Sequence, residues 1–226
     1  RPPPQVLIEA RFVNLSQETG NDYFAEGMTD SLIAALSGIG SLRVISRRSV
    51  MLYKDSTLPL AEIGERLDVQ VIVEGSVLRS GSRVRITAQV ISLEPESQLW
   101  GGSFDGDAED VLRLLDDVAE TVTREVKGSL APDESRRLGR LGAVDPEAFD
   151  YCLKGRYYWY GMGSPDLELA LDYFERAVAL DPQNAIAHTG VADIWGSSGV
   201  WGVVPPEKAL SMTVPALKKA LTIDDQ

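Results

Sequence analysis

The chain has 226 residues, of which 44% are hydrophobic, a composition that allows packed cores and excludes global disorder. Its formal net charge of −12 disfavours binding to a phosphate backbone unless a local basic surface overrides it. The single cysteine, Cys152, excludes an internal disulfide and a thiolate metal site. No apolar run approaches the roughly 20 residues of a membrane span. We therefore expect one large or two small folded domains.

Strand and helix signals alternate in the first half of the chain, after a proline-rich start (1–5) that is typical of an extended linker. Helices are recognised by apolar residues that recur every three or four positions, and strands by β-branched or alternating residues. In chain order these criteria predict a strand at 6–13, a helix at 22–37, a strand at 42–53, a helix at 59–68, strands at 70–79 and 83–93, a short strand at 98–104 and a helix at 108–127. The order predicts an α/β domain over 6–130, in which helices pack on a sheet of mixed strands.

The clearest local signal in this half is a β-hairpin. A short loop that contains glycine, Ser80-Gly81-Ser82, separates two β-rich runs. In the second run apolar residues alternate with Arg83, Arg85, Thr87 and Gln89; they are Val84, Ile86, Ala88 and Val90. This alternation predicts a strand with one buried and one exposed face.

Two of the predicted helices carry a continuous apolar stripe. The stripe of 22–37 consists of Phe24, Met28, Leu32 and Leu36, and that of 108–127 consists of Val111, Leu115, Val118 and Val122. Asp22 and Asp107 are placed to cap these helices at their N-termini. Gly38 is placed to end the first helix.

From residue 131 onwards the strand signals disappear. The segment 131–145 is polar and contains glycine, so we place a domain boundary there. Beyond it, a helix–turn–helix pattern repeats with a period near the roughly 34 residues of a TPR unit. We assign a first unit to 146–182 and a second to 184–225, within a helical region over 146–226.

The TPR pattern requires small residues where two helices approach each other and aromatic residues that fill the gap between them. The first unit supplies Tyr151, Gly155 and Tyr158 in one helix and Ala170, Phe174, Ala177 and Pro182 in and after the next. The second unit matches less closely, with His188, Ala192 and Trp195, then Leu217 and Ala220 in a helix at 206–223. Its inter-helix loop is long, and Asp225 stands where proline is expected.

The first half resembles the TolB amino-terminal-like domain in four runs: FVNLS (12–16), DYFAEGMTDSLIAALS (22–37), LRVISRRSVMLYK (42–54) and VEGSVLRSGSRVRITAQVI (73–91). The resemblance continues through two runs of the TPR region, DPEAFDYCLKGRYYW (145–159) and ALDYFERAVALDP (170–182). The chain departs from the family in its first strand, where family members usually read AVLPF and this chain reads LIEARF (7–12).

The resemblance implies a sensory region of a bacterial signalling protein. In this family the domain precedes TPRs in class III adenylate or guanylate cyclases, winged-helix transcriptional regulators and serine/threonine kinases. Their effector domain usually lies N-terminal, often followed by a membrane span. A span in the longer protein would place this region on the periplasmic, extracytoplasmic side, which we favour; a cytoplasmic location is the alternative.

The residues do not point to an active site. His188 is the only histidine, and it falls at a TPR packing position, so a catalytic triad or a histidine metal site is not expected. Gly38-Ile39-Gly40 is not a dinucleotide fingerprint, because the third glycine would fall at Arg43. The acidic pairs Glu109-Asp110 and Asp116-Asp117 are better explained as helix-end and solvated charge than as acid–base pairs. We expect no enzyme activity, no cofactor and no metal in this region.

Two sets of side chains are candidates for binding. A TPR groove is predicted to present Arg156, Trp159, Tyr160 and Asp193, which are offset by about one helical turn from the packing positions. The hairpin concentrates Arg79, Arg83 and Arg85, with further arginines at 43, 47 and 48. This second set is either an anion-binding site or a polar sheet face with scattered salt bridges.

We expect a non-catalytic sensory and protein-interaction region of a multidomain protein, whose TPR groove binds a protein or peptide. The alternative is a regulatory region of an adenylate cyclase or a transcriptional regulator that binds a small anionic ligand at the α/β domain. An enzyme and a nucleic-acid binder are the weaker hypotheses. We also expect the sequence to be part of a longer protein, because a TPR array needs a polar capping helix. Without one, the last helix should expose Leu217 and Leu221 or cover them in a homodimer.

Overall fold

The computed structural model describes residues 5–16, 22–40, 42–53, 56–128, 144–161 and 164–224. The chain divides into two compact units, Arg1–Ala143 and Val144–Gln226, and each is described here by itself. The predicted linker at 131–145 lies almost wholly outside the described residues. Among the helices in the described ranges, none combines the length and hydropathy needed to cross a membrane.

The first unit is built on a five-stranded sheet with the strand order β2-β1-β3-β4-β5. The strands are β1 (Gln5–Asn14), β2 (Arg43–Val44), β3 (Val71–Ser80), β4 (Arg83–Leu93) and β5 (Glu96–Asp107). β1 runs parallel to β2 and β3, whereas β3, β4 and β5 form an antiparallel meander. The unit is therefore a mixed α/β domain, as the order of elements predicts.

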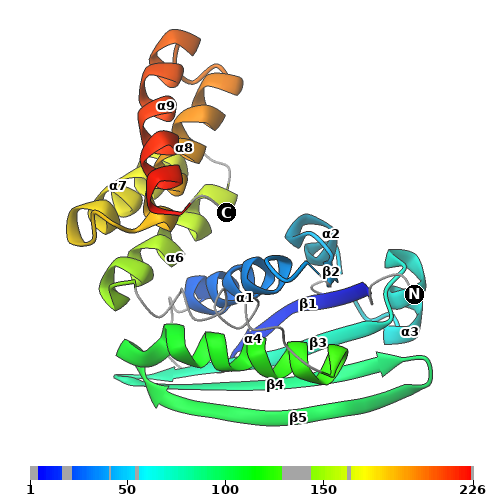
Figure 1. Cartoon of the computed structure of the whole chain (residues 1–226). Helices are drawn as coiled ribbons and strands as arrows, with labels where there is room; N and C mark the ends of the chain where they lie inside the picture. Colours follow the sequence, from blue (N-terminus) through cyan, green and yellow to red (C-terminus); the bar gives the residue numbers. More distant parts are fainter. Residues whose placement is uncertain are drawn as a thin grey trace. The chain divides into compact units, whose positions relative to one another are not determined.

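The helical elements of this unit are α1 (Asp22–Ser37), α2 (Arg47–Met51), α3 (Leu60–Leu67), a 3-10 turn η1 (Ala108–Asp110) and α4 (Val111–Lys127). Figure 1 shows α1 and α4 side by side on one face of the sheet. Both predicted apolar stripes are buried, from Phe24 to Leu36 on α1 and from Val111 to Val122 on α4. An added Cβ at Gly106 of β5 would lie 3.1 Å from Leu114, so a residue without a side chain lets α4 approach this strand.

The predicted hairpin joins β3 to β4. Ser80 pairs with Arg83, so the connection has two residues, and Gly81 adopts a φ of 57°, a conformation that favours glycine. The alternation on β4 is confirmed, because Val84, Ile86, Ala88 and Val90 are all buried on the face that carries the helices.

The pairing of β1 with β3 contains an irregularity. Its register shifts between Ile8 and Phe12. This interval lies in the run LIEARF (7–12), where the sequence departs from the family that it resembles. The first strand therefore forms as predicted, with an interrupted ladder.

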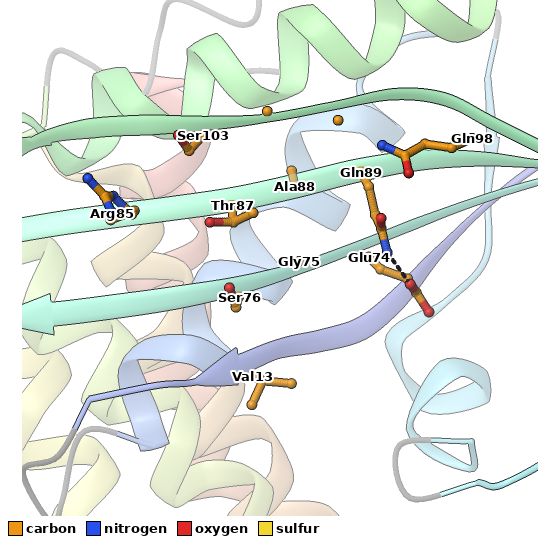
Figure 2. A pocket seen from close by; sticks show the side chains of 12 residues that line it. Val13, Glu74, Gly75, Ser76, Arg85, Thr87, Ala88, Gln89, Gln98 and Ser103 are labelled. Carbon is orange, nitrogen blue, oxygen red and sulfur yellow. Dashed lines mark hydrogen bonds between the residues drawn. The ribbon is translucent and has the colours of Figure 1, made fainter.

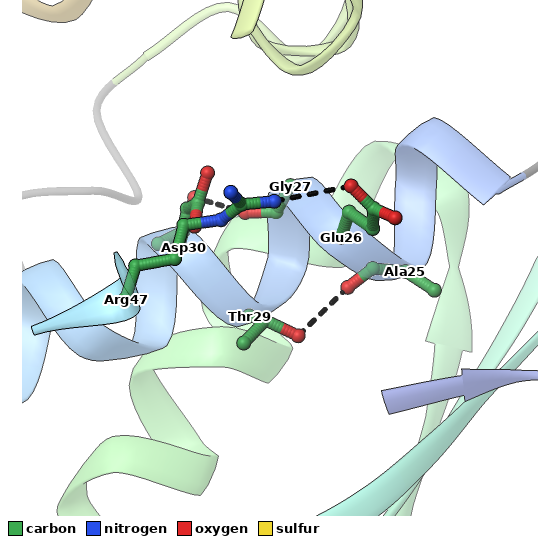
Figure 3. A network of polar contacts seen from close by, with 7 residues as sticks. Ala25, Glu26, Gly27, Thr29, Asp30 and Arg47 are labelled. Atoms are coloured by element: carbon green, nitrogen blue, oxygen red, sulfur yellow. Dashed lines mark hydrogen bonds and ion pairs between the residues drawn. The ribbon is translucent and has the colours of Figure 1, made fainter. Parts of the chain in front are cut away.

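The strand predicted at 42–53 is wrong for most of its length. Only Arg43–Val44 is extended, and the chain then forms α2. Arg47 forms ion pairs with Glu26 and Asp30 of α1 (Figure 3), and Val50 is buried. These contacts with distant residues favour a helix over the strand propensity of the local sequence.

Two further boundaries and one predicted helix cap differ from the predictions. β5 extends over Glu96–Asp107 rather than 98–104, because it follows β4 along nearly its whole length. The last helix of the unit begins with η1, before α4 starts at Val111. Asp107 makes no capping hydrogen bond to it, since its carboxylate lies 3.4 Å from the guanidinium of Arg83.

The second unit consists, in its described part, of helices that pack in chain order (Figure 1): α6 (Pro146–Gly161), α7 (Ser164–Leu180), α8 (Ala185–Val200) and α9 (Pro206–Ile223). α6 packs on α7 and α8 on α9, and further contacts join α7 with α8 and α6 with α8. The mixed α/β unit is therefore followed by an all-helical one.

Phe174 of α7 is the centre of the helical core. Its ring is fully buried and lies against two glycines on different helices, Gly155 of α6 and Gly190 of α8. A Cβ at Gly155 would lie 2.9 Å from this ring, and a Cβ at Gly190 would lie 2.2 Å from it. The predicted packing of a small residue against an aromatic one is thus present, and the role of Gly190 was not predicted.

Asn184 is a second buried feature that the sequence analysis missed. Its side-chain oxygen accepts a hydrogen bond from the backbone N–H of Ala187 at 3.0 Å and so caps α8. Its amide nitrogen lies 3.8 Å from Cys152 Sγ on α6. One polar side chain therefore connects the start of α8 to α6.

Candidate functional site

The two aromatic residues predicted for the groove lie at the end of α6 and differ in exposure. Tyr160 is 39% exposed, whereas Trp159 is half-buried and packs on the apolar core of the helical unit. Their ring centroids are 5.1 Å apart. Tyr160 is therefore the more accessible of the pair, and Trp159 lies between its ring and the core of the helical unit.

The two charged residues predicted for the groove act on each other electrostatically. Asp193 of α8 is half-buried, and this burial raises the pKa of its carboxyl group, while the positive charge of Arg156 on α6 lowers it. Within the described ranges neither side chain has a hydrogen bond or a close ion pair. Both groups are thus available to a ligand.

The remaining tyrosines of α6 belong to a cluster of tyrosine rings with Tyr173 of α7. Tyr158 stacks on Tyr173 of α7 at 5.6 Å, and Tyr173 stacks on Tyr151 at 6.0 Å. Tyr157 meets Tyr158 edge-on, and Lys154 Nζ lies 5.4 Å from the Tyr151 ring. The aromatic run 157–160 is therefore divided between this cluster and the Trp159–Tyr160 pair.

A pocket of about 340 Å³ lies between α8 and α9, and the sequence analysis did not predict it. Its lining combines one carboxylate, two hydroxyl groups and apolar side chains: Ala192, Asp193, Gly196, Ser197, Val200, Trp201, Thr213 and Leu217. The sequence could have indicated its position, because glycine and serine recur at 196–199 on a helix where larger side chains would fill the space.

The structure does not bring the three hairpin arginines together. Arg79 lies directly opposite Val84, so it belongs to the helix-covered face of the sheet. Its guanidinium group lies 5.0 Å from the Phe24 ring. Arg83 and Arg85 belong to the other face, where each forms an ion pair with an aspartate of β5. Only Arg83 and Arg85 could therefore share a ligand.

The open face of the sheet is hollowed. A shallow cavity of about 720 Å³ extends over β1, β3, β4 and β5. Figure 2 shows Ser76, Thr87 and Ser103 along its floor, with Arg85 nearby. Arg85 Nε already lies 2.6 Å from Asp105, so an anion in this cavity would have to compete with that carboxylate.

The groups that could carry out catalysis have structural roles. Burial raises the pKa of the Cys152 thiol to about 12, which disfavours the nucleophilic thiolate. His188 Nε2 lies 3.1 Å from the backbone oxygen of Pro182. Among the described residues, no three or more His, Cys, Asp and Glu side chains gather in a group that could hold a metal ion.

One sequence relative extends over most of the chain. The chain is 32% identical over 198 residues to "Putative adenylate cyclase 3" of Rhizobium meliloti (strain 1021). The match covers 85% of this chain but 34% of that protein, so the chain spans about a third of the length of its relative. No protein-family model matches the chain.

Solved structures resemble the chain distantly. They include TolB of Acinetobacter baumannii, with 12% identity, a TM-score of 0.41, and coverage of 57% of this chain and 29% of that one. The C-terminal domain of LpoB from Salmonella enterica has 16% identity, a TM-score of 0.37, and coverage of 46% and 82%. A lipoprotein of Neisseria meningitidis has 18% identity, a TM-score of 0.40, and coverage of 57% and 100%. With TM-scores this low, these similarities establish neither a fold family nor a function for the chain.

Proposed function

We propose that this chain is a non-catalytic sensory and protein-interaction region of a multidomain bacterial signalling protein. The observation that carries the proposal is the match to part of a protein named as an adenylate cyclase, over about a third of its length. Most of that protein lies outside the match, as expected for a regulatory region joined to a separate effector domain. The α/β unit corresponds in this proposal to the TolB-like domain at 6–130, and the helical unit to TPR repeats at 146–226.

The helical packing supports the TPR assignment. α6 contacts both its partner α7 and the first helix of the next pair, α8, as expected when repeats stack on their neighbours. Phe174 occupies the space left by glycines on both of these helices. Leu217 and Leu221 of α9 are 40% and 61% exposed, the apolar surface expected where a further repeat or a second copy would pack.

In this proposal the partner is a protein or peptide that binds along α6 and α8. Tyr160 supplies an exposed aromatic anchor, and Arg156 and Asp193 supply charges without hydrogen bonds among the described residues. Aromatic and arginine side chains are the residues that most often dominate binding energy in protein interfaces. The region itself carries no reaction, and its incubation with ATP and Mg²⁺ should give no cyclic AMP.

The test is photocrosslinking in cells that express the full-length protein. A photoreactive phenylalanine derivative replaces Tyr160, and in a control variant it replaces Glu175, an exposed residue of α7. We expect one dominant protein adduct from position 160, weakened by Arg156→Ala, and little from position 175. Equal adducts from both positions would contradict a specific groove.

A second candidate function rests on the hollow of the sheet. The hydroxyl groups of Ser76, Thr87 and Ser103 and the guanidinium of Arg85 suit a small anionic ligand. Thermal shifts with citrate and sulfate test it. An increase in Tm that Arg85→Gln removes would favour this ligand-sensing function, and no increase with either anion would remove it.

A further inference from the structure

The pocket between α8 and α9 has the features of a binding site for one side chain of a partner. Its volume of about 340 Å³ exceeds that of any single side chain, so one residue of a partner can enter it. Trp201 is 48% exposed, which leaves its indole surface accessible to a ligand.

The pocket is lined by one ionisable side chain, and its charge is negative. Among the residues that line it, Asp193 is the one with an ionisable side chain. Its carboxylate is half-buried and has no hydrogen bond within the described part of the chain. A desolvated carboxylate without hydrogen-bond donors gains most from a ligand that supplies both donors and a positive charge.

The charged groups around Asp193 do not fill this role. Arg156 of α6 acts on Asp193 through its charge but forms no close ion pair with it. Lys208 of α9 lies with its Nζ 5.4 Å from the ring of Trp195, and neither residue lines the pocket. The site is therefore preformed and acidic.

We propose that this pocket receives an arginine side chain of the protein partner, with Asp193 as its counter-ion and Trp201 as its stacking surface. Guanidinium is planar and weakly hydrated, so it can pair with the carboxylate while its face lies on the indole ring. Ammonium is more strongly hydrated and offers no flat face, so lysine fits this combination less well. This inference rests on the proposed function for the existence of a protein partner, and it adds the chemistry of the residue that is recognised.

The hydroxyl groups of the pocket complete the donor and acceptor arrangement. Ser197 lines the same wall as Asp193, one helical turn further along α8. A guanidinium has five N–H donors, more than one carboxylate can accept, and a serine oxygen can accept one of the remainder. Ser197 is therefore a positioning residue for the ligand, and Asp193 is its charge partner.

The test uses small probes that carry the side-chain chemistry alone. The chain is titrated with n-butylguanidinium, n-butylammonium or the neutral N-butylurea, while the indole N–H resonance of Trp201 is followed by NMR. For a probe of this size we expect saturation by n-butylguanidinium with a Kd of the order of 10 mM. N-butylurea should not saturate, and n-butylammonium should bind more weakly than n-butylguanidinium.

Two variants with the same change in net charge provide the control. Asp193→Asn should abolish the saturable shift of Trp201, whereas Asp172→Asn, which removes an exposed carboxylate paired with Arg176 on α7, should leave it unchanged. Equal shifts by the neutral probe, tighter binding of ammonium, or retention of binding in Asp193→Asn would each overturn the inference.

The outcome is independent of the crosslinking test of the proposed function. If position 160 gives its adduct but n-butylguanidinium does not bind, this inference fails and the groove proposal stands. If n-butylguanidinium binds but position 160 gives no adduct, the proposed function fails and the pocket is still a guanidinium site.

Discussion

At the scale of single residues, Asp193 is the candidate binding residue whose titration the fold alters. Burial raises the pKa of its carboxyl, and the charge of Arg156 only partly opposes this. Folding therefore disfavours the charged form relative to the neutral form, and the contribution of this group to stability is present below the unfolded pKa and lost as pH rises through the folded pKa. Asp193→Asn should therefore have a higher Tm than the parent chain at pH 7.

The difference in Tm should shrink as pH falls and disappear at about pH 2.5, where the carboxyl group is protonated in both states. Thermal denaturation at the two pH values, followed by circular dichroism, measures it. A lower Tm for Asp193→Asn at pH 7 would show that Asp193 stabilises the fold as a charge, and would weaken its assignment to binding.

Gly190 carries the second prediction at this scale. A Cβ there would lie 2.2 Å from the buried ring of Phe174, so Gly190→Ala should destabilise the helical unit by about 1–3 kcal/mol through overpacking. Gly196→Ala is the matched control on the same helix, since its nearest contact is 3.8 Å away. Urea denaturation should show the control unchanged or more stable by up to about 1 kcal/mol. Equal effects of both variants would contradict the proposed packing.

At the scale of elements, α2 is joined to α1 by the ion pairs of Arg47 with Glu26 and Asp30. The Arg47 side chain is 15% exposed and that of Asp30 is 5% exposed, so removing the cation takes an ion-pair partner away from a buried carboxylate. We expect Arg47→Ala to lower the free energy of unfolding by about 3–5 kcal/mol. Arg48→Ala, at the exposed neighbouring position, should change it by less than about 0.5 kcal/mol. Urea titrations of the two variants compare them directly, and similar losses would refute the role of the ion pairs.

The same element shows where sequence reasoning fails. The hairpin was predictable because its alternation and its glycine loop are local features, and Val84 and Ile86 are buried as expected. The strand at 42–53 was predicted from equally local features, but the segment forms α2, in which Arg47 pairs with residues about 20 positions earlier. Contacts of that kind leave no periodic signal in the segment itself.

At the scale of the whole molecule, each unit has its own core. Val50, Ile63 and Ile72 lie in the core of the α/β unit, and Phe174 lies in the core of the helical unit. We predict two separable unfolding transitions in calorimetry. Arg47→Ala should shift one of them and Gly190→Ala the other. A single transition that both variants shift equally would contradict independent domains.

The candidate sites were predictable only in part. Helical periodicity predicts that Arg156 and Tyr160 are offset from the packing positions Tyr151, Gly155 and Tyr158. The grouping of Arg79 with Arg83 and Arg85 was wrong, because the turn has two residues rather than the three assigned to the loop and so places Arg79 opposite the inward-facing Val84. The small residues at 196–199 indicate where the pocket beside Asp193 lies, but its lining could not be derived, since it depends on how α9 returns after residues 201–205.

The central claim is that the chain acts by binding a protein through its helical unit. Isothermal titration calorimetry with the partner identified by crosslinking measures this most directly. We predict that replacing Arg156 and Tyr160 together with alanine weakens the Kd at least about tenfold, whereas Arg83→Gln with Arg85→Gln leaves it within about twofold. The opposite result, with full affinity after the helical substitutions and loss after the sheet substitutions, would contradict the account and assign binding to the α/β unit.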